Sequence, residues 1–175
     1  MDYKAQYQIY LSQVSSALEN ACERFLPENS EVCRAARYSL LSGGKRIRAV
    51  LTLSVCEMLG GDMDAARSFS AAVEMLHCYS LIHDDLPCMD NDDLRRGRPS
   101  CHKAFGEATA MLAGDVLLTE AFDAIANAPA SAQARVRAAQ ALGMGAGSHG
   151  MVYGQELDLK YEALAATEEQ LRLIH

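Results

Sequence analysis

The stretch that leads up to Pro87 is the feature that most constrains the fold of this 175-residue chain. Phe69, Val73 and Leu76 recur at intervals of three or four residues along it, which is the spacing of one buried face of a helix. Pro87 ends the pattern, because a residue that precedes proline is pushed out of the α region. The sequence therefore predicts a long core helix that starts after Asp64, runs to about residue 85 and opens into a polar loop.

The rest of the chain has the composition of an all-α protein. Ala, Leu, Met, Glu and Gln are abundant, and stretches of Val, Ile and Thr that alternate with polar residues are scarce, which favours helices over strands. Further helices are predicted over residues 1–26, 30–41, 45–59, 103–127, 131–147, 149–160 and 167–175. We therefore expect a single all-α antiparallel helix bundle, a class that builds ligand sites between facing helices.

Charge and hydropathy exclude several classes of function. The chain is 50% hydrophobic and carries a formal net charge of −7, which argues against disorder and against a nucleic-acid-binding surface. It contains no run of about 18 apolar residues, so we expect no membrane insertion. The first residues lack the basic and apolar regions of a signal peptide. None of the six cysteines has C-x-x-C spacing, which is typical of reduced thiols in a cytoplasmic protein.

The strongest chemical signal in the sequence is the run HDDLPCMDNDDLRRGRP. Asp84 and Asp85 lie at the predicted C-terminus of a helix, where the helix dipole disfavours acids, and Asp90 adds to the repulsion. Carboxylates without Cys or paired His suit Mg²⁺, with Mn²⁺ as the alternative. Arg95 and Arg96 add planar guanidinium groups that match phosphate oxygens. The run therefore predicts a site for a divalent metal ion and a diphosphate.

A second signal is the segment SGGKRIR. Its glycines, Gly44 among them, let the backbone approach a ligand closely. Lys45 and Arg48 are three residues apart at a predicted helix start, so they project from one face beside the positive end of that helix. His77 precedes Asp84 by seven residues and therefore lies within about 20° of the same helical face. We expect an anion site here; an ordinary helix start and a core histidine are the alternatives.

Two weaker patterns leave alternatives open. Gln155 and Asp158 are three residues apart on a predicted helix and are candidates to face a ligand. His83 and the aspartate after it resemble the metal-binding dyad of helical phosphohydrolases, for which His102 and His149 would supply further ligands. That alternative leaves the paired arginines without a role.

Taken together, these motifs resemble those of the trans-isoprenyl diphosphate synthases, the polyprenyl synthetase family. DDLPCMDNDDLRRGRPS resembles the family's first aspartate-rich motif, GGKRIR its homoallylic-substrate motif, and GMVYGQELDL a Gly-Gln-x-x-Asp segment of a later helix. The resemblance implies a bundle of the isoprenoid synthase type that is incomplete at its C-terminus. Residues 1–175 would be the N-terminal portion of one prenyl synthase domain, without the family's Lys-Thr pair and its second aspartate-rich motif.

The resemblance also implies a role for each candidate residue and a homodimeric assembly. Asp84 and Asp90 would hold Mg²⁺ with Asp85 in support, and Arg95 would bind the diphosphate of an allylic substrate. The diphosphate of isopentenyl diphosphate would be bound by Gly44, Lys45, Arg48, His77 and Arg96.

The implied reaction is a Mg²⁺-dependent condensation of isopentenyl diphosphate with dimethylallyl or geranyl diphosphate. Tyr79, about 7.5 Å before Asp84 along the helix, would limit product length together with Ser80. In the family, an aromatic residue at this position together with four residues between Asp85 and Asp90 is typical of farnesyl diphosphate synthases, so the resemblance implies the C15 product farnesyl diphosphate, with C20 geranylgeranyl diphosphate as the alternative. Because the second acidic motif is missing, we expect little activity from these residues alone. The rival functions are a non-catalytic partner subunit of a related enzyme and a helical metal phosphohydrolase.

Overall fold

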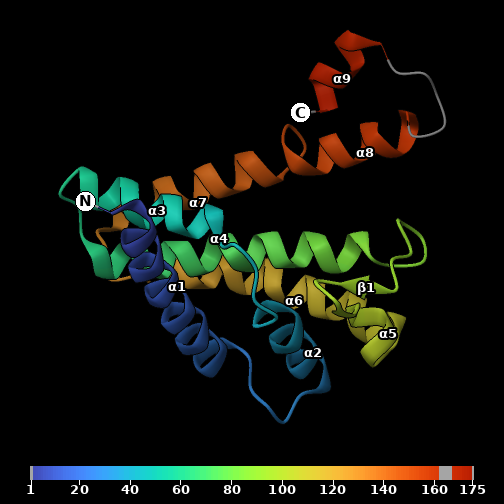
Figure 1. Ribbon diagram of the computed structural model, residues 1–175, viewed down its shortest axis with the longest axis horizontal. Helices are drawn as coiled ribbons and strands as arrows, with labels where there is room; N and C mark the ends of the chain where they lie inside the picture. The colour runs from blue at the N-terminus through green and yellow to red at the C-terminus, as the bar shows by residue number, and fades with distance from the viewer. Residues whose placement is uncertain (1, 162–166, 175) are drawn as a thin grey trace. The chain divides into compact units, whose positions relative to one another are not determined.

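A computed structural model describes residues 2–161 and 167–174 of the chain (Figure 1). The chain divides into two compact units, Met1–Arg135 and Val136–His175, and each is described by itself. In order along the chain, the elements are α1 (Tyr3–Phe25), α2 (Glu31–Leu40), α3 (Ile47–Met58), α4 (Met63–Asp84), β1 (Leu94–Arg95), β2 (Arg98–Pro99), α5 (Cys101–Phe105), α6 (Glu107–Ala126), α7 (Ala132–Ala146), α8 (Met151–Tyr161) and α9 (Glu168–Ile174). The predicted all-α class is confirmed.

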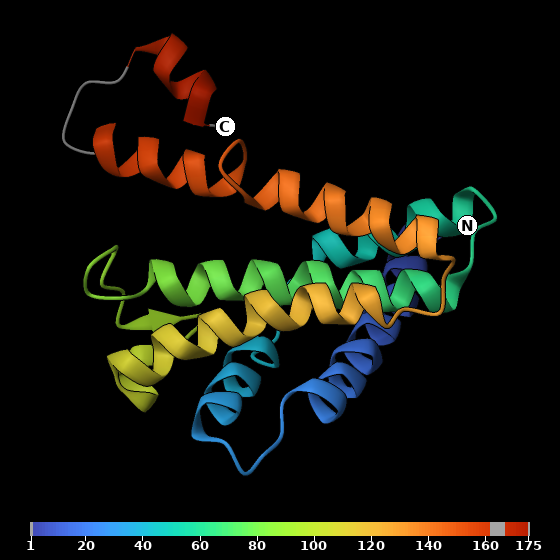
Figure 2. The same ribbon diagram turned by 180° about the vertical axis from the view of Figure 1, so that it is seen from behind.

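Helix α4 is the centre of the first unit. It packs along α6 and also against α3 and α1, and Figures 1 and 2 both show α4 and α6 side by side, running in opposite directions. Its buried face differs from the predicted stripe. Ala72, Met75 and Ile82 are buried, whereas Phe69 and Val73, two residues of the predicted stripe, are only half-buried. The long core helix that the sequence predicted before Pro87 is therefore present.

Two helix predictions are corrected by positive backbone φ angles. The single helix predicted over residues 103–127 is two helices, because Gly106 between α5 and α6 has a φ of 86°. Helix α3 begins at Ile47 rather than at residue 45, because Arg46 has a left-handed φ of 51°. Lys45 therefore precedes the helix, and it does not share a helical face with Arg48 as the spacing suggested.

The predicted polar loop after α4 contains a small antiparallel hairpin. Its two strands, β1 and β2, pair Leu94 with Pro99 and Arg95 with Arg98. The two turn residues, Arg96 and Gly97, have φ angles of 55° and 77°, as the tightest hairpin turns require. The hairpin fixes the directions in which Arg95 and Arg96 leave the chain, whereas the sequence predicted only a polar loop there.

The second unit contains the rest of α7 together with α8 and α9, and α8 packs against α9. Thr167 and Gln170 form a reciprocal cap at the start of α9, with backbone-to-side-chain hydrogen bonds of 2.8 and 3.3 Å. This pairing is the capping box of a helix N-terminus. Gln155 and Asp158 lie on α8, and their proposed contact with a ligand stays a prediction.

All six cysteines are free thiols, as the spacing predicted. Within residues 2–161 and 167–174, no helix is both long enough and apolar enough to cross a membrane.

Candidate active site

The turn after α4 returns the chain to the end of that helix. The Met89 and Asn91 amides donate to the Leu86 carbonyl at 2.8 and 3.1 Å, and the Asp90 amide donates to the Asp84 carbonyl at 2.9 Å. Asp84 is half-buried and Asp90 is exposed. The four residues between Asp85 and Asp90 thus bring the third aspartate of the motif back beside the first. We call residues 84–90 the acidic turn.

Asp85 points into the protein rather than toward solvent. It is only 2% exposed, and its carboxylate accepts hydrogen bonds from Arg95 Nε at 3.0 and 3.2 Å and from Arg95 Nη2. Arg95 also contacts Asp92 at 3.3 Å. The hydrogen bond to Asp85 raises the pKa of Arg95. Asp85 therefore anchors the first arginine of the motif, and the supporting role in holding Mg²⁺ that the resemblance implied for it stays a prediction.

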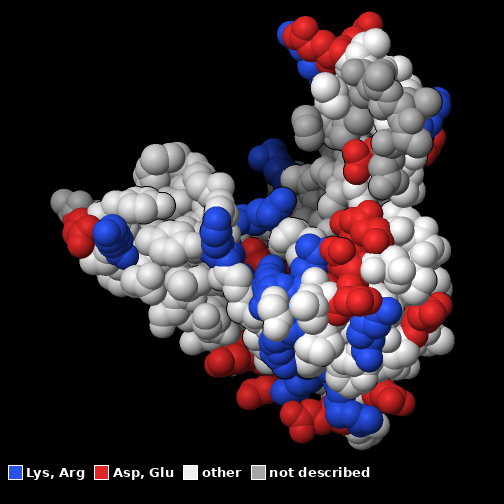
Figure 3. Space-filling view, turned by 45° about the vertical axis from the view of Figure 1, so that its right-hand side comes forward, with Lys and Arg blue, Asp and Glu red and all other residues white. Residues whose placement is uncertain are grey.

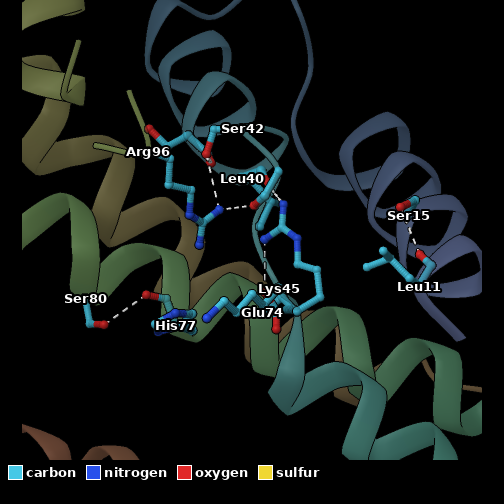
Figure 4. Close-up of polar contacts among 12 residues, drawn as sticks. Leu11, Ser15, Leu40, Ser42, Lys45, Glu74, His77, Ser80 and Arg96 are labelled. Carbon is cyan, nitrogen blue, oxygen red and sulfur yellow. Dashed lines mark hydrogen bonds and ion pairs between the residues drawn. The ribbon is translucent and has the colours of Figure 1, made fainter. Parts of the chain in front are cut away.

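Arg96 reaches from the hairpin to the glycine loop before α3. Its guanidinium donates to the Ser42 hydroxyl at 3.3 Å and to the Gly43 carbonyl. A Cβ atom at Gly44 would lie 2.6 Å from Arg96 Cζ, so the missing side chain at this position makes room for the guanidinium. Figure 4 shows Arg96 pointing at Ser42, with Lys45 and His77 below it in this view.

His77 lies among the basic residues of this loop. Burial lowers the pKa of His77, and the positive charges of Arg48, Arg96 and Arg46 lower it further against the opposing effect of Glu74. Lys45 and Arg48 are exposed, and the backbone carbonyl of Lys45 accepts a hydrogen bond from the Tyr7 hydroxyl. We call Lys45, Arg48, His77 and Arg96 the basic subsite.

Sequence reasoning missed a buried ion pair under the basic subsite. Arg46 is 8% exposed and Glu74 is 1% exposed; Arg46 donates to the Glu74 carboxylate at 2.9 Å and to the Leu40 carbonyl. The pair ties the loop before α3 to the middle of α4. The available signal was Glu74 itself, a charged residue between Ala71, Ala72 and Met75 on the core helix.

The surface near these residues mixes both signs of charge. Figure 3 shows Lys and Arg side chains gathered on one face, directly beside a group of Asp and Glu side chains. The basic side chains favour an anion and the acidic ones a cation, although the net charge of the chain is −7.

The acidic turn fits Mg²⁺ by the chemistry of its donors. Among the residues that the structure describes, no three His, Cys, Asp or Glu side chains converge into a complete cage. Mg²⁺ is commonly bound by one or two carboxylates while water and phosphate oxygens complete its octahedron. Asp84 and Asp90 match this requirement, because the backbone hydrogen bond between them brings the two residues together and both carry hard oxygen donors. The residues present therefore fit the metal.

Two histidines of the phosphohydrolase alternative, His83 and His102, are bound at different places in the first unit. His83 donates through Nε2 to the Met111 carbonyl at 2.9 Å, and its ring faces Gly114, where a Cβ atom would lie 2.1 Å from Nε2. His102 is buried, with Nδ1 3.0 Å from the Ser100 hydroxyl. Both rings are therefore engaged by protein atoms at different places.

Tyr79 is buried on α4, and its ring meets the His83 ring edge-on at a centroid distance of 5.6 Å. Burial raises the pKa of Tyr79, and the charge of Asp84 raises it further. The hydroxyl of Ser80 donates to the His77 carbonyl at 2.9 Å. These two predicted chain-length residues therefore lie on α4, between the basic subsite and the acidic turn.

Comparison with known proteins agrees with this geometry: the polyprenyl synthetase family matches residues 29–175, so the chain belongs to that family. It is 46% identical over 166 residues to a farnesyl diphosphate synthase of Micrococcus luteus, covering 95% of this chain and 56% of the relative. It is 48% identical over 169 residues to the large subunit 1 of a heterodimeric geranylgeranyl pyrophosphate synthase of Arabidopsis thaliana, covering 93% and 45%.

Solved structures share the fold. A geranyltransferase from Legionella pneumophila superposes with a TM-score of 0.93 at 43% identity, covering 98% of this chain and 61% of that one. An FPP/GFPP synthase from Zymomonas mobilis superposes with a TM-score of 0.89 at 36% identity, covering 97% and 64%. The chain spans about half the length of the curated relatives it matches.

Proposed function

We propose that this chain carries the diphosphate-binding part of a Mg²⁺-dependent trans-prenyltransferase, which joins isopentenyl diphosphate to an allylic diphosphate. The observation that supports it most is the hairpin, which sends Arg95 to the acidic turn and Arg96 to the basic subsite. Two adjacent residues thereby serve two anion sites, as a reaction between two diphosphates requires. The homodimer implied by the resemblance stays a prediction.

The residues divide the work of aligning two anions that repel each other, which is the main task of such an enzyme. Asp84 and Asp90 would hold Mg²⁺, which neutralises charge on the departing pyrophosphate. Arg95, fixed by Asp85, binds the oxygens of the same allylic diphosphate and stabilises charge as it develops. Isopentenyl diphosphate is held by Lys45, Arg48, His77 and Arg96. Its double bond attacks the allylic carbon as the carbon–oxygen bond to the pyrophosphate breaks, and the departing pyrophosphate then takes up the proton that is lost.

A hybrid protein tests this proposal. Residues 1–175 replace the matching part of the Micrococcus luteus farnesyl diphosphate synthase, and condensation is followed with isopentenyl and geranyl diphosphate. We expect Mg²⁺-dependent carbon–carbon bond formation. A folded hybrid that releases inorganic phosphate without condensation would instead support the phosphohydrolase, and a folded hybrid that does neither would support a non-catalytic partner. The 175-residue chain alone should show only background condensation, because it contains one acidic motif.

For the product, we propose C15 farnesyl diphosphate, limited by the buried ring of Tyr79. Relatives that make farnesyl and geranylgeranyl diphosphate both resemble the chain, so C20 is the alternative. In the hybrid, Tyr79→Ala should lengthen the product, as measured by mass spectrometry, because the ring no longer blocks the space before Asp84. Tyr3→Ala, on a side chain that is 77% exposed, is the matched control. An unchanged C15 product would contradict the role of Tyr79.

A further inference from the structure

Tyr38, near the end of α2, makes three different contacts with the hairpin region. Its hydroxyl donates to the Pro99 carbonyl at 2.8 Å. The guanidinium of Arg98 lies over its ring, 4.3 Å from the centroid. On α5, Phe105 meets the same ring edge-on at a centroid distance of 5.3 Å. One side chain therefore joins α2 to β2 and to the helix that follows it.

Besides Tyr38, the hairpin is held by the hydrogen bonds of Arg95 with Asp85 and of Arg96 with Ser42 and Gly43. A cavity of about 30 Å³ lies beneath it, lined in part by Tyr38, Arg95, Arg96 and Arg98. The strands are only two residues long each, and two-stranded hairpins are marginal without further packing. Contacts from outside the hairpin must therefore hold it in place.

Tyr38 also connects the two anion sites through the chain. Ser42 and Gly43, four and five residues after Tyr38, accept hydrogen bonds from the Arg96 guanidinium. Arg95, on the other side of the turn, is fixed by Asp85. A shift of the hairpin relative to α2 would move both arginines together. The ring of Tyr38, on α2, resists such a shift because it contacts Arg98 on β2 and Phe105 on α5 at the same time.

We propose that Tyr38 is a positioning residue that clamps the β1–β2 hairpin onto α2 and so presents Arg95 and Arg96 to an anionic ligand. The clamp itself follows from contacts within the chain; only the choice of a diphosphate as ligand rests on the proposed function. Tyr38 does not touch the ligand in this proposal. It acts through the hairpin.

Two variants separate the parts of the clamp. Tyr38→Phe keeps the ring contacts and loses the hydroxyl, whereas Tyr38→Leu loses all three contacts. Hydrogen–deuterium exchange of the hairpin amides, residues 94–98, is measured on the ligand-free chain. Exchange should accelerate about tenfold in Tyr38→Leu and about threefold in Tyr38→Phe, in line with the strength of aromatic contacts and of one hydrogen bond. Tyr3→Leu, a matched exposed control, should leave it unchanged.

Calorimetry with inorganic pyrophosphate and Mg²⁺ supplies the second readout. The Kd should rise about tenfold in Tyr38→Leu, with most of the affinity retained in Tyr38→Phe. Unchanged hairpin exchange in a folded Tyr38→Leu variant would overturn the clamp. If that variant does not fold, unchanged hairpin exchange in Tyr38→Phe would overturn the clamp. A wild-type chain that binds no pyrophosphate would overturn the proposed function instead, while the exchange result still decides the clamp.

Discussion

The two halves of the candidate site are held in place by different means. The basic subsite stands on side-chain contacts that are buried or close-packed: the pair of Arg46 and Glu74, and the guanidinium of Arg96 against Gly44. The acidic turn is shaped by backbone hydrogen bonds, such as that from Asp90 to Asp84. The comparison teaches that the basic subsite depends on buried side chains of the core, and it predicts that a change at the exposed Asp90 disturbs the fold less.

The largest effect on stability is expected where the basic subsite meets the core. Glu74→Ala leaves the buried guanidinium of Arg46 without its partner, which costs about 3–5 kcal/mol in the free energy of unfolding. Urea denaturation measures the loss. Glu28→Ala, which removes the exposed partner of Arg37, is the matched control and should cost less than about 1 kcal/mol. Equal losses in both variants would show that the buried pair does not support the loop.

A smaller effect is expected at the glycine loop. Gly44→Ala places a methyl group 2.6 Å from Arg96 Cζ, so the guanidinium must move, and pyrophosphate binding should weaken about tenfold. Gly43→Ala is a matched control, because Gly43 also has a positive φ, of 83°, but a Cβ atom there meets nothing within 4 Å. Calorimetry compares the two variants. If both weaken binding equally, backbone strain rather than the displaced arginine is responsible.

The smallest effect is a pH dependence at His77. Its pKa is lowered in the folded chain, mainly by burial, so the unfolded chain binds more protons below the ordinary pKa near 6.5. Stability contributed by neutral His77 is therefore present above pH 6.5 and is lost as the pH falls toward the lowered pKa. Urea denaturation at pH 7.5 and 5.5 should show a smaller loss in His77→Gln than in the wild type. An equal loss of stability in His77→Gln and in the wild type would show that His77 is not the source of the pH dependence.

The sequence predicted the helices well where one residue pattern decided the outcome. The apolar spacing and Pro87 placed α4 correctly, and Ser30 caps α2 through a hydrogen bond from the Cys33 amide at 3.3 Å. The errors fall where tertiary contacts compete with local preference. Arg46 takes a left-handed φ and delays α3 because its side chain binds Glu74, a partner 28 residues away. Gly106 is a different case: its positive φ of 86° divides a segment whose composition favours one continuous helix, and this break is local.

The candidate site was predictable as a set of residues but not as an arrangement. The acids and arginines are contiguous in the motif, so their types alone indicated metal and diphosphate chemistry. Their arrangement depends on the turn at Leu86 and on the hairpin. The turn brings Asp84 and Asp90 together, and the hairpin places Arg95 where Asp85 turns inward to meet it. Two-residue strands leave no periodic pattern, so neither the hairpin nor the contact of Tyr38 with Pro99 could be read from the sequence.

The contrast between the two halves is tested most directly by calorimetry of the 175-residue chain with geranyl thiolodiphosphate, an allylic diphosphate analogue that cannot ionise readily. We expect Mg²⁺ to tighten binding of the analogue about tenfold or more, and we expect Asp84→Ala to abolish that gain while the Tm stays within about 2 °C of the wild type. A gain from Mg²⁺ that survives in Asp84→Ala, or a wild-type chain that does not bind the analogue, would contradict the account.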